Sequence, residues 1–564
     1  MLFQSLRQRG TRAFRSIDLE TLLIAAAFHI PLTYLFVLIV VKSMWWETTI
    51  DTPLFMYSGF LMDKLGMAPV RDFFTYNMPG THVIFRWIYH FFGSSILGMR
   101  LADTLILALI LVLFARILKP FGLRVVWAGT VLFGILHITL GTHVYLQRDY
   151  MALVPLQLAI LSASTWFSRR ERLRWFMTGL FTGLLATIKP HLMLGGLVLY
   201  AYLAIDAANT ANVDCRGRLF RAVKIGLWCV VGGVVPILWM IAYLAYYGVL
   251  AEFVTVLTQY FPLHADINGG HVVFDEGEKL TYRFAGVFDK YPWDYFQLAI
   301  GVTGGIALFL TSPSGAGNEK KYGYLLLALG AVYFVYPAIA ARFYDHHYYP
   351  FRLLSVIWIA FCLRNWGTDT PLRVRLCSYG IAGFVVVGIF YVNFGLLQFT
   401  PAKMDPYFQT ERLTNWLRQR MQPDDTAQAI EWAFCGSTHA LLRLEAKPAT
   451  QTIWGEVFFH HVSNPFVRKL KGDFIRQLSE SEPRFVVQTK MEMDFVDGRD
   501  CSREFPELDA ILRERYFVAL ESTGFRVWES NTSPTAESDR KTQDAVVKER
   551  GPFEDKSDDD EMVR

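Results

Sequence analysis

The chain has few charged residues for its length: Asp, Glu, Lys and Arg make up 19% of its 564 residues, against roughly 25% in soluble domains. A soluble chain of this size would divide into several domains, because one hydrophobic core stops growing at about 250–300 residues. Each domain would need its own polar surface, and a chain that is 53% hydrophobic lacks the residues to build them. The composition therefore excludes a fully soluble multidomain protein, and it also excludes a disordered one.

Two kinds of local motif are also missing. The six cysteines show no CxxC pair and no other metal-binding spacing. The sequence contains no glycine-rich phosphate loop of the Walker type. Neither a cysteine-bound metal nor a Walker-type phosphate site is therefore expected.

Long hydrophobic runs are present instead, and most approach the roughly 20 residues that a helix needs to cross a bilayer. The first run is too long for the apolar part of a cleaved signal peptide, and it is expected to be a signal anchor. We predict an all-α polytopic membrane protein with about 11 to 13 transmembrane helices. The runs lie at residues 19–42, 97–115, 125–143, 150–167, 175–188, 192–205, 225–247, 295–312, 322–340, 350–363 and 376–397.

The segments between these runs alternate in basic content. Twenty Lys and Arg residues occupy every second segment, at 7–15, 116–124, 169–174, 216–224, 320–321 and 364–375. Because basic residues accumulate on the cytoplasmic side of membrane proteins, we predict a cytoplasmic N-terminus and a C-terminal region on the outer face. Basic residues that are explained by topology give no support for nucleic-acid binding.

The composition changes after Phe399, and three regions are predicted: a membrane module at 1–400, an outer-face α/β domain at 401–530 and a disordered acidic tail at 531–564. Cys435 and Cys501 would share the outer-face domain and could pair, although two unpaired thiols are favoured. Helical patterns lie at 411–421 and 465–482, and strand patterns at 426–434, 450–454, 484–490 and 517–529.

Two of the predicted outer-face loops are long. The loop at 43–96 is rich in aromatic residues, and its residues 81–92 are expected to form an amphipathic helix on the membrane surface. The loop at 248–294 carries seven acidic residues and the pair Gly269-Gly270. Both a mobile substrate lid and a solvated connector fit this second loop.

Ionisable residues are costly within a membrane, so those kept at the ends of spans point to a site. Four such clusters fall on the predicted outer face: Asp51, Gln147-Arg148-Asp149, Lys189-Pro190-His191 and residues 342–350. Each has a structural alternative, namely a helix cap, an interfacial ion pair, a snorkelling lysine and an aromatic belt. Because all four clusters fall on the same side of the membrane, we favour a single site that they share.

These residue types suit transfer from a lipid-linked phosphate. Asp51 could act as a general base on an acceptor hydroxyl, while cationic groups could hold an anionic phosphate. Asp51 and Asp149 could instead bind a divalent cation, but neither lies in a paired-acid motif, so neither a metal nor another cofactor is expected. The predicted phosphate-binding residues are Arg148, Lys189, His191, Arg342, His346, His347 and Tyr348.

The order of these features resembles the GT-C superfamily of integral-membrane glycosyltransferases, which includes aminoarabinose transferases, protein O-mannosyltransferases and oligosaccharyltransferases. The resemblance covers about residues 19–400, and this chain departs from several members in lacking an Asp-Glu pair at Asp51. The matching positions are Asp51, Pro53, Tyr57, 66–72, 78–80, 92–94, Arg100-Leu101, Asp149, 183–190 and 346–350.

The resemblance implies inverting transfer of a hexosyl or pentosyl group from a polyprenyl-phosphate sugar to a hydroxyl of a glycan, lipid or protein. Asp51 would be the catalytic acid/base residue, supported by Tyr57, Arg71, Asp72 and Asp149. We expect the outer face of a bacterial inner membrane, because one N-x-Ser/Thr acceptor, at Asn531, is found and lies in the tail. A polysaccharide polymerase or O-antigen ligase is the alternative. A secondary transporter fits less well, because its charges would lie at mid-membrane depth.

Overall fold

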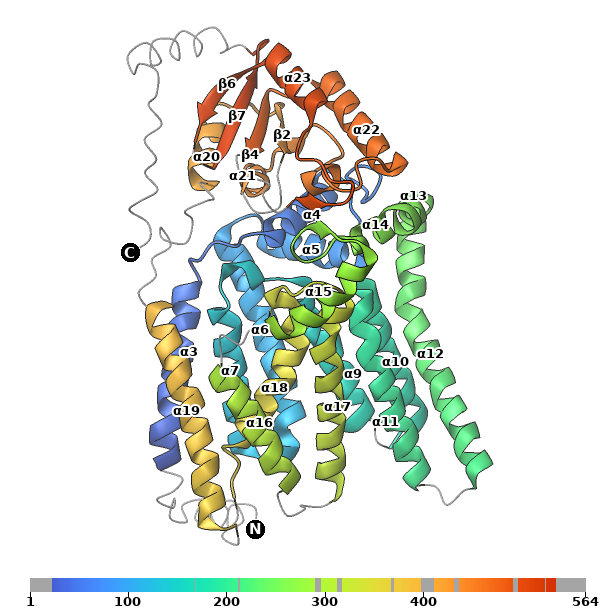
Figure 1. Cartoon of the computed structure of the whole chain (residues 1–564), viewed down its shortest axis with the longest axis vertical. Coiled ribbons are helices and arrows are strands. Elements are labelled where there is room, and N and C mark those ends of the chain that lie inside the picture. Colours follow the sequence, from blue (N-terminus) through green and yellow to red (C-terminus); the bar gives the residue numbers. More distant parts are fainter. Residues whose placement is uncertain are drawn as a thin grey trace, which may run out of the picture.

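The computed structural model describes residues 23–533, apart from 168, 211–213, 290–295, 312–316, 367–369, 397–409, 431–435, 490–495 and 523. Cys435 and residues 534–564 lie outside the described residues, so the Cys435–Cys501 pairing and most of the predicted tail do too. The chain forms a helical bundle, a layer of short helices at one end of it, and a sheet with flanking helices beyond that layer (Figure 1).

A helix lies at each of the predicted apolar runs, and these helices stand side by side in the lower part of Figure 1. Within the described residues, six stretches are long and apolar enough to cross a membrane: Ala26–Ser43, Ile96–Phe121, Pro190–Asn209, Cys215–Tyr246, Glu319–Ile339 and Leu372–Tyr391. The exact number of spans stays a prediction. The bundle helices are α3 (Ile30–Ser43), α6 (Ile96–Leu118), α7 (Leu123–Thr139), α9 (Leu153–Ser164), α10 (Glu171–Ile188), α11 (Gly195–Thr210), α12 (Cys215–Tyr246), α16 (Phe296–Thr311), α17 (Gly317–Ile339), α18 (Tyr349–Phe361) and α19 (Leu372–Leu396).

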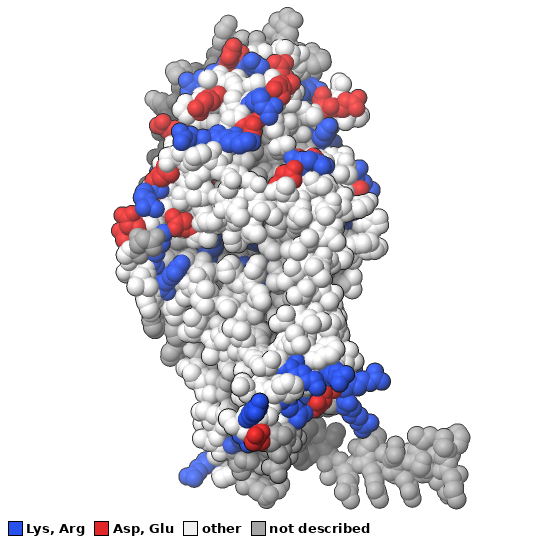
Figure 2. Space-filling view, turned by 90° about the vertical axis from the view of Figure 1, so that its right-hand side faces the viewer, with Lys and Arg blue, Asp and Glu red and all other residues white. Residues whose placement is uncertain are grey.

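The side of the bundle is apolar. Leu227, Val230 and Trp239 of α12 are each at least half exposed. Exposure of such side chains to water costs free energy. Contact with lipid would remove this cost, because lipid tails are as apolar as these side chains. Figure 2 shows Lys and Arg gathered at the lower end, mixed charges at the upper end, and a wide band without charge between them. This is the surface of a multi-pass membrane protein.

Helices α10 and α12 approach each other closely because glycines line their contact. A Cβ atom added at Gly179 would lie 1.9 Å from the carbonyl oxygen of Cys229. One added at Gly183 would lie 2.1 Å from the carbonyl oxygen of Gly233. Small residues four apart allow such backbone contact in membrane helices.

The predicted loop at 43–96 is largely helical in the structure: α4 (Asp51–Lys64) and α5 (Pro79–Phe92) pack against each other across the upper end of the bundle. Helix α5 begins at a proline, which suits a first helical position. Trp87 and Phe91 of α5 are exposed and stack on each other with ring centroids 5.7 Å apart. This helix agrees with the amphipathic segment predicted at 81–92.

The segment from 248 to 289 forms α13 (Leu250–Thr255), η5 (Val256–Tyr260), α14 (Phe261–Asp266), β1 (Val272–Val273) and α15 (Glu276–Asp289). Strand β1 pairs in parallel with β5 (Asp497–Gly498) of the C-terminal region. The side chains of His460 and His461 bond to the carbonyl oxygens of His271 and Leu263, at 2.7 Å and 3.0 Å. The segment is therefore packed against the C-terminal region, and its function as a lid stays a prediction.

The C-terminal region contains a five-stranded mixed sheet in the order β3-β2-β4-β7-β6. Side chains alternate across it: Phe485 and Val487 face the core that includes α20 and α21, whereas Val486 faces α22 and α23. Its elements are α20 (Thr410–Arg418), β2 (Thr426–Ile430), α21 (Ser437–Leu444), β3 (Lys447–Pro448), η9 (Gly455–Phe458), α22 (Pro465–Ser481), β4 (Phe485–Thr489), α23 (Pro506–Arg515), β6 (Tyr516–Glu521) and β7 (Phe525–Ser530).

The strand predicted at 450–454 is wrong. These residues are irregular, and the strand that pairs with β2 is the two-residue β3 immediately before them. The backbone N–H groups of Thr450 and Gln451 bond to the side chains of Gln428 and Gln477, at 3.0 Å and 2.8 Å. These backbone N–H groups are therefore not available for hydrogen bonds to a neighbouring strand. The sequence pattern does not predict that glutamine side chains would bind them.

Candidate active site

Asp51 lies where the bundle meets the C-terminal region. It is the first residue of α4, after Ile50, whose φ of 61° is in the left-handed region. The Thr52 hydroxyl donates a hydrogen bond of 2.5 Å to the carbonyl oxygen of Tyr145, which ties this helix start to the bundle. Burial raises the pKa of Asp51, the positive charge of Arg148 opposes this, and the negative charge of Glu456 adds to it. A carboxylate in such a setting is a stronger base than an exposed one.

Three basic side chains act on Asp51 from three separate elements. Arg148 begins α8 (Arg148–Met151), Lys189 follows the last residue of α10, and Arg342 follows α17. The charges of all three lower the pKa of Asp51, so all three lie near enough to favour its anion. The clusters predicted separately from the sequence therefore meet at one place.

Arg148 is incompletely satisfied. Its Nη1 donates a hydrogen bond to Asn77 Oδ1, and its guanidinium lies 5.1 Å from the centroid of the Phe55 ring. Its Nε is buried and has no hydrogen-bond partner among the described residues. An unpaired buried donor on a cation is costly, and an anionic oxygen would remove that cost.

Lys189 and Asp149 form a buried ion pair. Lys189 Nζ donates to Asp149 Oδ2 at 2.7 Å, and the Tyr336 hydroxyl donates to Asp149 Oδ1 at 3.1 Å. Burial lowers the pKa of Lys189 to about 8, although the carboxylate of Asp149 opposes this. His191 lies beside this pair, with its ring centroid 6.5 Å from that of Tyr336.

The later histidine cluster joins the same place. Arg342 Nη2 donates to the carbonyl oxygen of His264 at 2.8 Å, and the Arg342 carbonyl oxygen is 2.8 Å from His347 Nδ1. Asp149, His346 and His347 each offer one ligand atom, and these atoms lie within 4.8 Å of one another, a spacing that could hold a metal ion. The expected absence of a metal thus stays a prediction. A metal ion bound here would compete with the Lys189 ammonium for the Asp149 carboxylate.

Four predicted residues make their contacts elsewhere. The Tyr57 hydroxyl donates to the carbonyl oxygen of Ala446 at 2.7 Å, so it binds the C-terminal region to α4. Arg71 and Asp72 pair at 2.9 Å on the surface, where Arg71 also donates to the carbonyl oxygen of Tyr247. The Tyr348 ring lies 5.9 Å from the guanidinium of Arg352. For these four the contacts give a structural reason, and their supporting or binding roles stay predictions.

The structure adds Glu456, which the sequence reasoning missed. Glu456 is buried in η9, its Oε2 accepts from Trp454 Nε1 at 2.9 Å, and its Oε1 lies 3.3 Å from His271 Nδ1. Burial acts to raise the pKa of Glu456, yet the adjacent His271 and the charge of Arg342 hold this pKa well below its ordinary value. The one sequence signal is an acid inside the apolar stretch 452–459, and nothing in that stretch predicts which distant residues it meets.

Comparisons with known proteins identify the fold. No protein-family model and no curated protein matches this sequence. Among solved structures, the chain is similar to ArnT from Cupriavidus metallidurans in the apo state, with a TM-score of 0.56 and 12% identity over 89% of this chain and 98% of that one. It is also similar to ArnT from the same organism bound to undecaprenyl phosphate, with a TM-score of 0.54 and 12% identity over 91% and 99% of the two chains. The resemblance to GT-C glycosyltransferases is thus confirmed at the level of the fold.

Proposed function

We propose that the chain is a glycosyltransferase that uses a polyprenyl-phosphate sugar as donor. The observation that carries this proposal is the group of three cations that act on a half-buried Asp51, one of them with an unpaired buried donor. Such a site has a base and an anion-binding wall side by side. The fold shared with ArnT, which has been solved with undecaprenyl phosphate bound, gives further support.

In the proposed reaction the acceptor hydroxyl oxygen attacks the anomeric carbon of the donor sugar. A new carbon–oxygen bond forms as the bond from that carbon to the phosphate oxygen breaks. Asp51 takes the hydroxyl proton, and polyprenyl phosphate leaves as an anion held by Arg148, Lys189 and Arg342, with the nearby histidines in support. No acid is needed, because the leaving group is stable as an anion.

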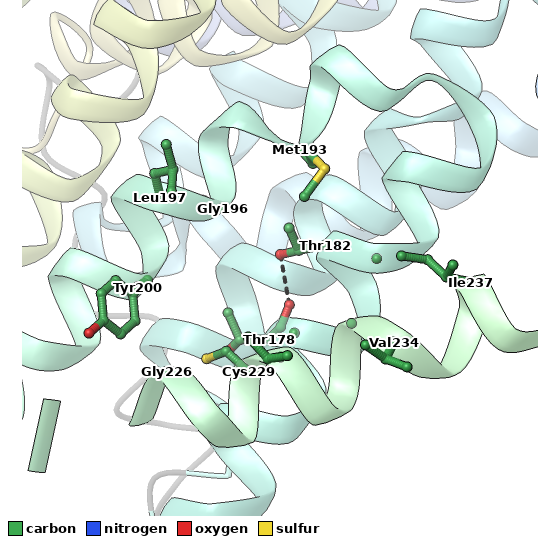
Figure 3. A pocket seen from close by; sticks show the side chains of 14 residues that line it. Thr178, Thr182, Met193, Gly196, Leu197, Tyr200, Gly226, Cys229, Val234 and Ile237 are labelled. Carbon is green, nitrogen blue, oxygen red and sulfur yellow. Dashed lines mark hydrogen bonds between the residues drawn. The ribbon is translucent and has the colours of Figure 1, made fainter. Parts of the chain in front are cut away.

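The donor tail has a place to lie. A groove of about 430 Å³ runs between α10, α11 and α12 and is lined almost entirely by apolar groups. Figure 3 shows Thr178 and Thr182 in its wall, and the Thr182 hydroxyl donates to the carbonyl oxygen of Thr178 at 2.8 Å, so this polar group is satisfied within its own helix. Met193 also lines the groove and lies four residues after Lys189. We assign the tail to this groove and the phosphate to the cations beyond it.

The charge pattern supports a location for the reaction. The site lies at the end of the bundle opposite the basic end, and basic ends face the cytoplasm. We therefore propose transfer at the outer face of a bacterial inner membrane, to a hydroxyl of a glycan, lipid or protein. The C-terminal region would close the site from above, with Glu456 facing the acceptor.

Mass spectrometry of the lipids that co-purify with the full chain tests this function. We expect a polyprenyl phosphate, with or without its sugar, in the wild type, and a loss of at least about tenfold in a Lys189→Gln variant, because a hydrogen bond to a charged group is worth about 1.5–3 kcal/mol. Arg86→Gln, which alters a partly exposed arginine of α5, is the matched control. A wild-type protein that carries other lipids but no polyprenyl phosphate would refute the proposal.

A further inference from the structure

A second groove lies far from the candidate active site, at the basic end of the bundle. It measures about 480 Å³ and runs between α11 and α17, which pack against each other. The groove beside α12 in Figure 3 has no charged residue in its wall, whereas this one has Lys320 and Lys321. Its lining differs enough to require a different occupant.

The lining changes from polar at the basic end of the bundle to apolar farther along the groove. Both helices show this change in the same direction. On α11 the lining runs from Asn209 at the basic end to Val198, eleven residues earlier in the chain. Helix α17 runs the opposite way, and its lining begins at Lys320 and ends at Ala328. Eleven helical residues span about 16 Å, which is close to the length of one acyl chain.

Positive charge is in excess at the polar end. Asp206 is bound by two cations: Arg174 Nη1 donates to its Oδ2 at 2.8 Å, and Lys321 Nζ donates to its Oδ1. Lys320 Nζ donates a long hydrogen bond of 3.5 Å to the carbonyl oxygen of Leu310. Arg174, Lys320 and Lys321 therefore outnumber Asp206, the neighbouring Glu319 is paired with Arg364, and an added anion would balance the excess.

We propose that this groove binds an anionic phospholipid of the leaflet at the basic end of the bundle. The phosphate would lie between Lys320, Lys321 and the amide of Asn209, with the Tyr324 hydroxyl within the same lining. One acyl chain would follow Ile205 and Leu325 into the apolar part. Basic pockets between transmembrane helices on the cytoplasmic side are known to hold acidic headgroups. This site does not depend on the proposed transfer reaction.

Native mass spectrometry of the purified full chain tests the proposal, with phosphatidylglycerol and phosphatidylcholine of identical acyl chains added in equal amounts. We expect the wild type to retain phosphatidylglycerol about tenfold better, since Lys residues near the membrane surface attract anionic headgroups. The double variant Lys320→Gln with Lys321→Gln should bring the two lipids to near equality. Ala328→Trp, which fills the apolar part and keeps every charge, should lower the retention of both.

The control removes the same number of charges at the same end of the bundle. Arg216→Gln with Arg218→Gln alters two exposed arginines of α12 that do not line the groove, and it should leave the tenfold preference in place. An equal loss in this control would mean general attraction to the basic end and would overturn the proposal. So would competition by soluble glycerol phosphate as strong as that by the lipid, since the apolar wall would then contribute nothing.

Discussion

Two clusters of charge, one buried and one partly buried, lie near the upper end of the bundle, and they differ in how completely they are paired. The first is built on Arg100, Asp103 and His137, within the bundle helices α6 and α7. The second is built on Asp51, Arg148, Lys189 and Arg342, between the bundle and the C-terminal region. The comparison separates charge that holds the fold together from charge that is available to a ligand.

The first cluster is closed. Asp103 Oδ2 lies 3.1 Å from both Arg100 Nη1 and His137 Nε2, and Asp103 Oδ1 accepts from the backbone N–H of Leu146 at 3.1 Å. Arg100 Nε donates to the carbonyl oxygen of Ser43 at 2.9 Å, and His137 Nδ1 lies 2.7 Å from the Tyr349 hydroxyl. Every charged group has partners, so the cluster has no capacity left for a ligand.

The second cluster is open. Arg148 Nε has no partner in the described part of the chain, and Arg342 uses its Nη2 on backbone carbonyl oxygens rather than on an acid. Of the three cations, Lys189 pairs directly with an acid, Asp149, and Glu456 adds a third acid to Asp51 and Asp149. Incomplete pairing is costly for folding, and a site that keeps it gains the ability to bind an anion.

The largest expected effect is on catalysis at the open cluster. Asp51→Asn removes the general base without a change of shape, and transfer should fall by about 10²–10⁴-fold. The yield and thermal unfolding of the purified protein should stay close to wild type. Asp63→Asn on the same helix, whose carboxylate pairs with His90 at 3.2 Å, should retain transfer. Full transfer by a well-folded Asp51→Asn protein would remove the assigned role.

The closed cluster should respond in the opposite way. Asp103→Ala leaves the buried charge of Arg100 unpaired, which costs about 3–5 kcal/mol of the free energy of unfolding. We expect a lower unfolding temperature and a poor yield in detergent. The protein that does fold should transfer at a rate near that of the wild type. A variant of normal stability and impaired turnover would instead place Asp103 in the site.

The basic limb of the pH profile tests Lys189. Burial holds the pKa of Lys189 to about 8, so its ammonium is lost, and donor affinity falls, as the pH rises through that value. Lys189→Arg keeps its charge at higher pH. We therefore expect the fall in kcat/KM near pH 8 to move to higher pH by more than one pH unit. An unchanged basic limb in a variant with normal activity at neutral pH would show that another group titrates there.

The acidic limb tests Glu456 and gives the smallest shift. The negative charge of Glu456 raises the pKa of Asp51, and transfer is lost as the pH falls through that pKa, because Asp51 must be ionised to accept a proton. Glu456→Gln should therefore move the acidic limb of kcat/KM to lower pH. Glu480→Gln makes the same change at an exposed acid of α22 and should leave the limb in place. A shift to higher pH would contradict the arrangement.

Much of the fold was predictable because the period and length of apolar runs are local properties. Asp51, Arg148, Lys189 and Arg342 could be grouped because each lies at a span end and topology assigns those ends to one side. Glu456 and His271 could not be found in this way, since they lie far apart in the chain and meet only in the folded protein. His137 was missed for a related reason: its partner Asp103 lies 34 residues earlier in the chain, on another helix.

Direct titration of the full chain with polyprenyl phosphate tests the central claim that the open cluster is an anion site. The comparison uses wild type, Arg148→Gln and Arg476→Gln, the last of which alters an exposed, paired arginine of α22. We predict that Kd rises about 10–100-fold for Arg148→Gln, because the lost hydrogen bonds involve a charged group, and that Arg476→Gln binds like the wild type. Equal affinity in all three proteins would contradict the account.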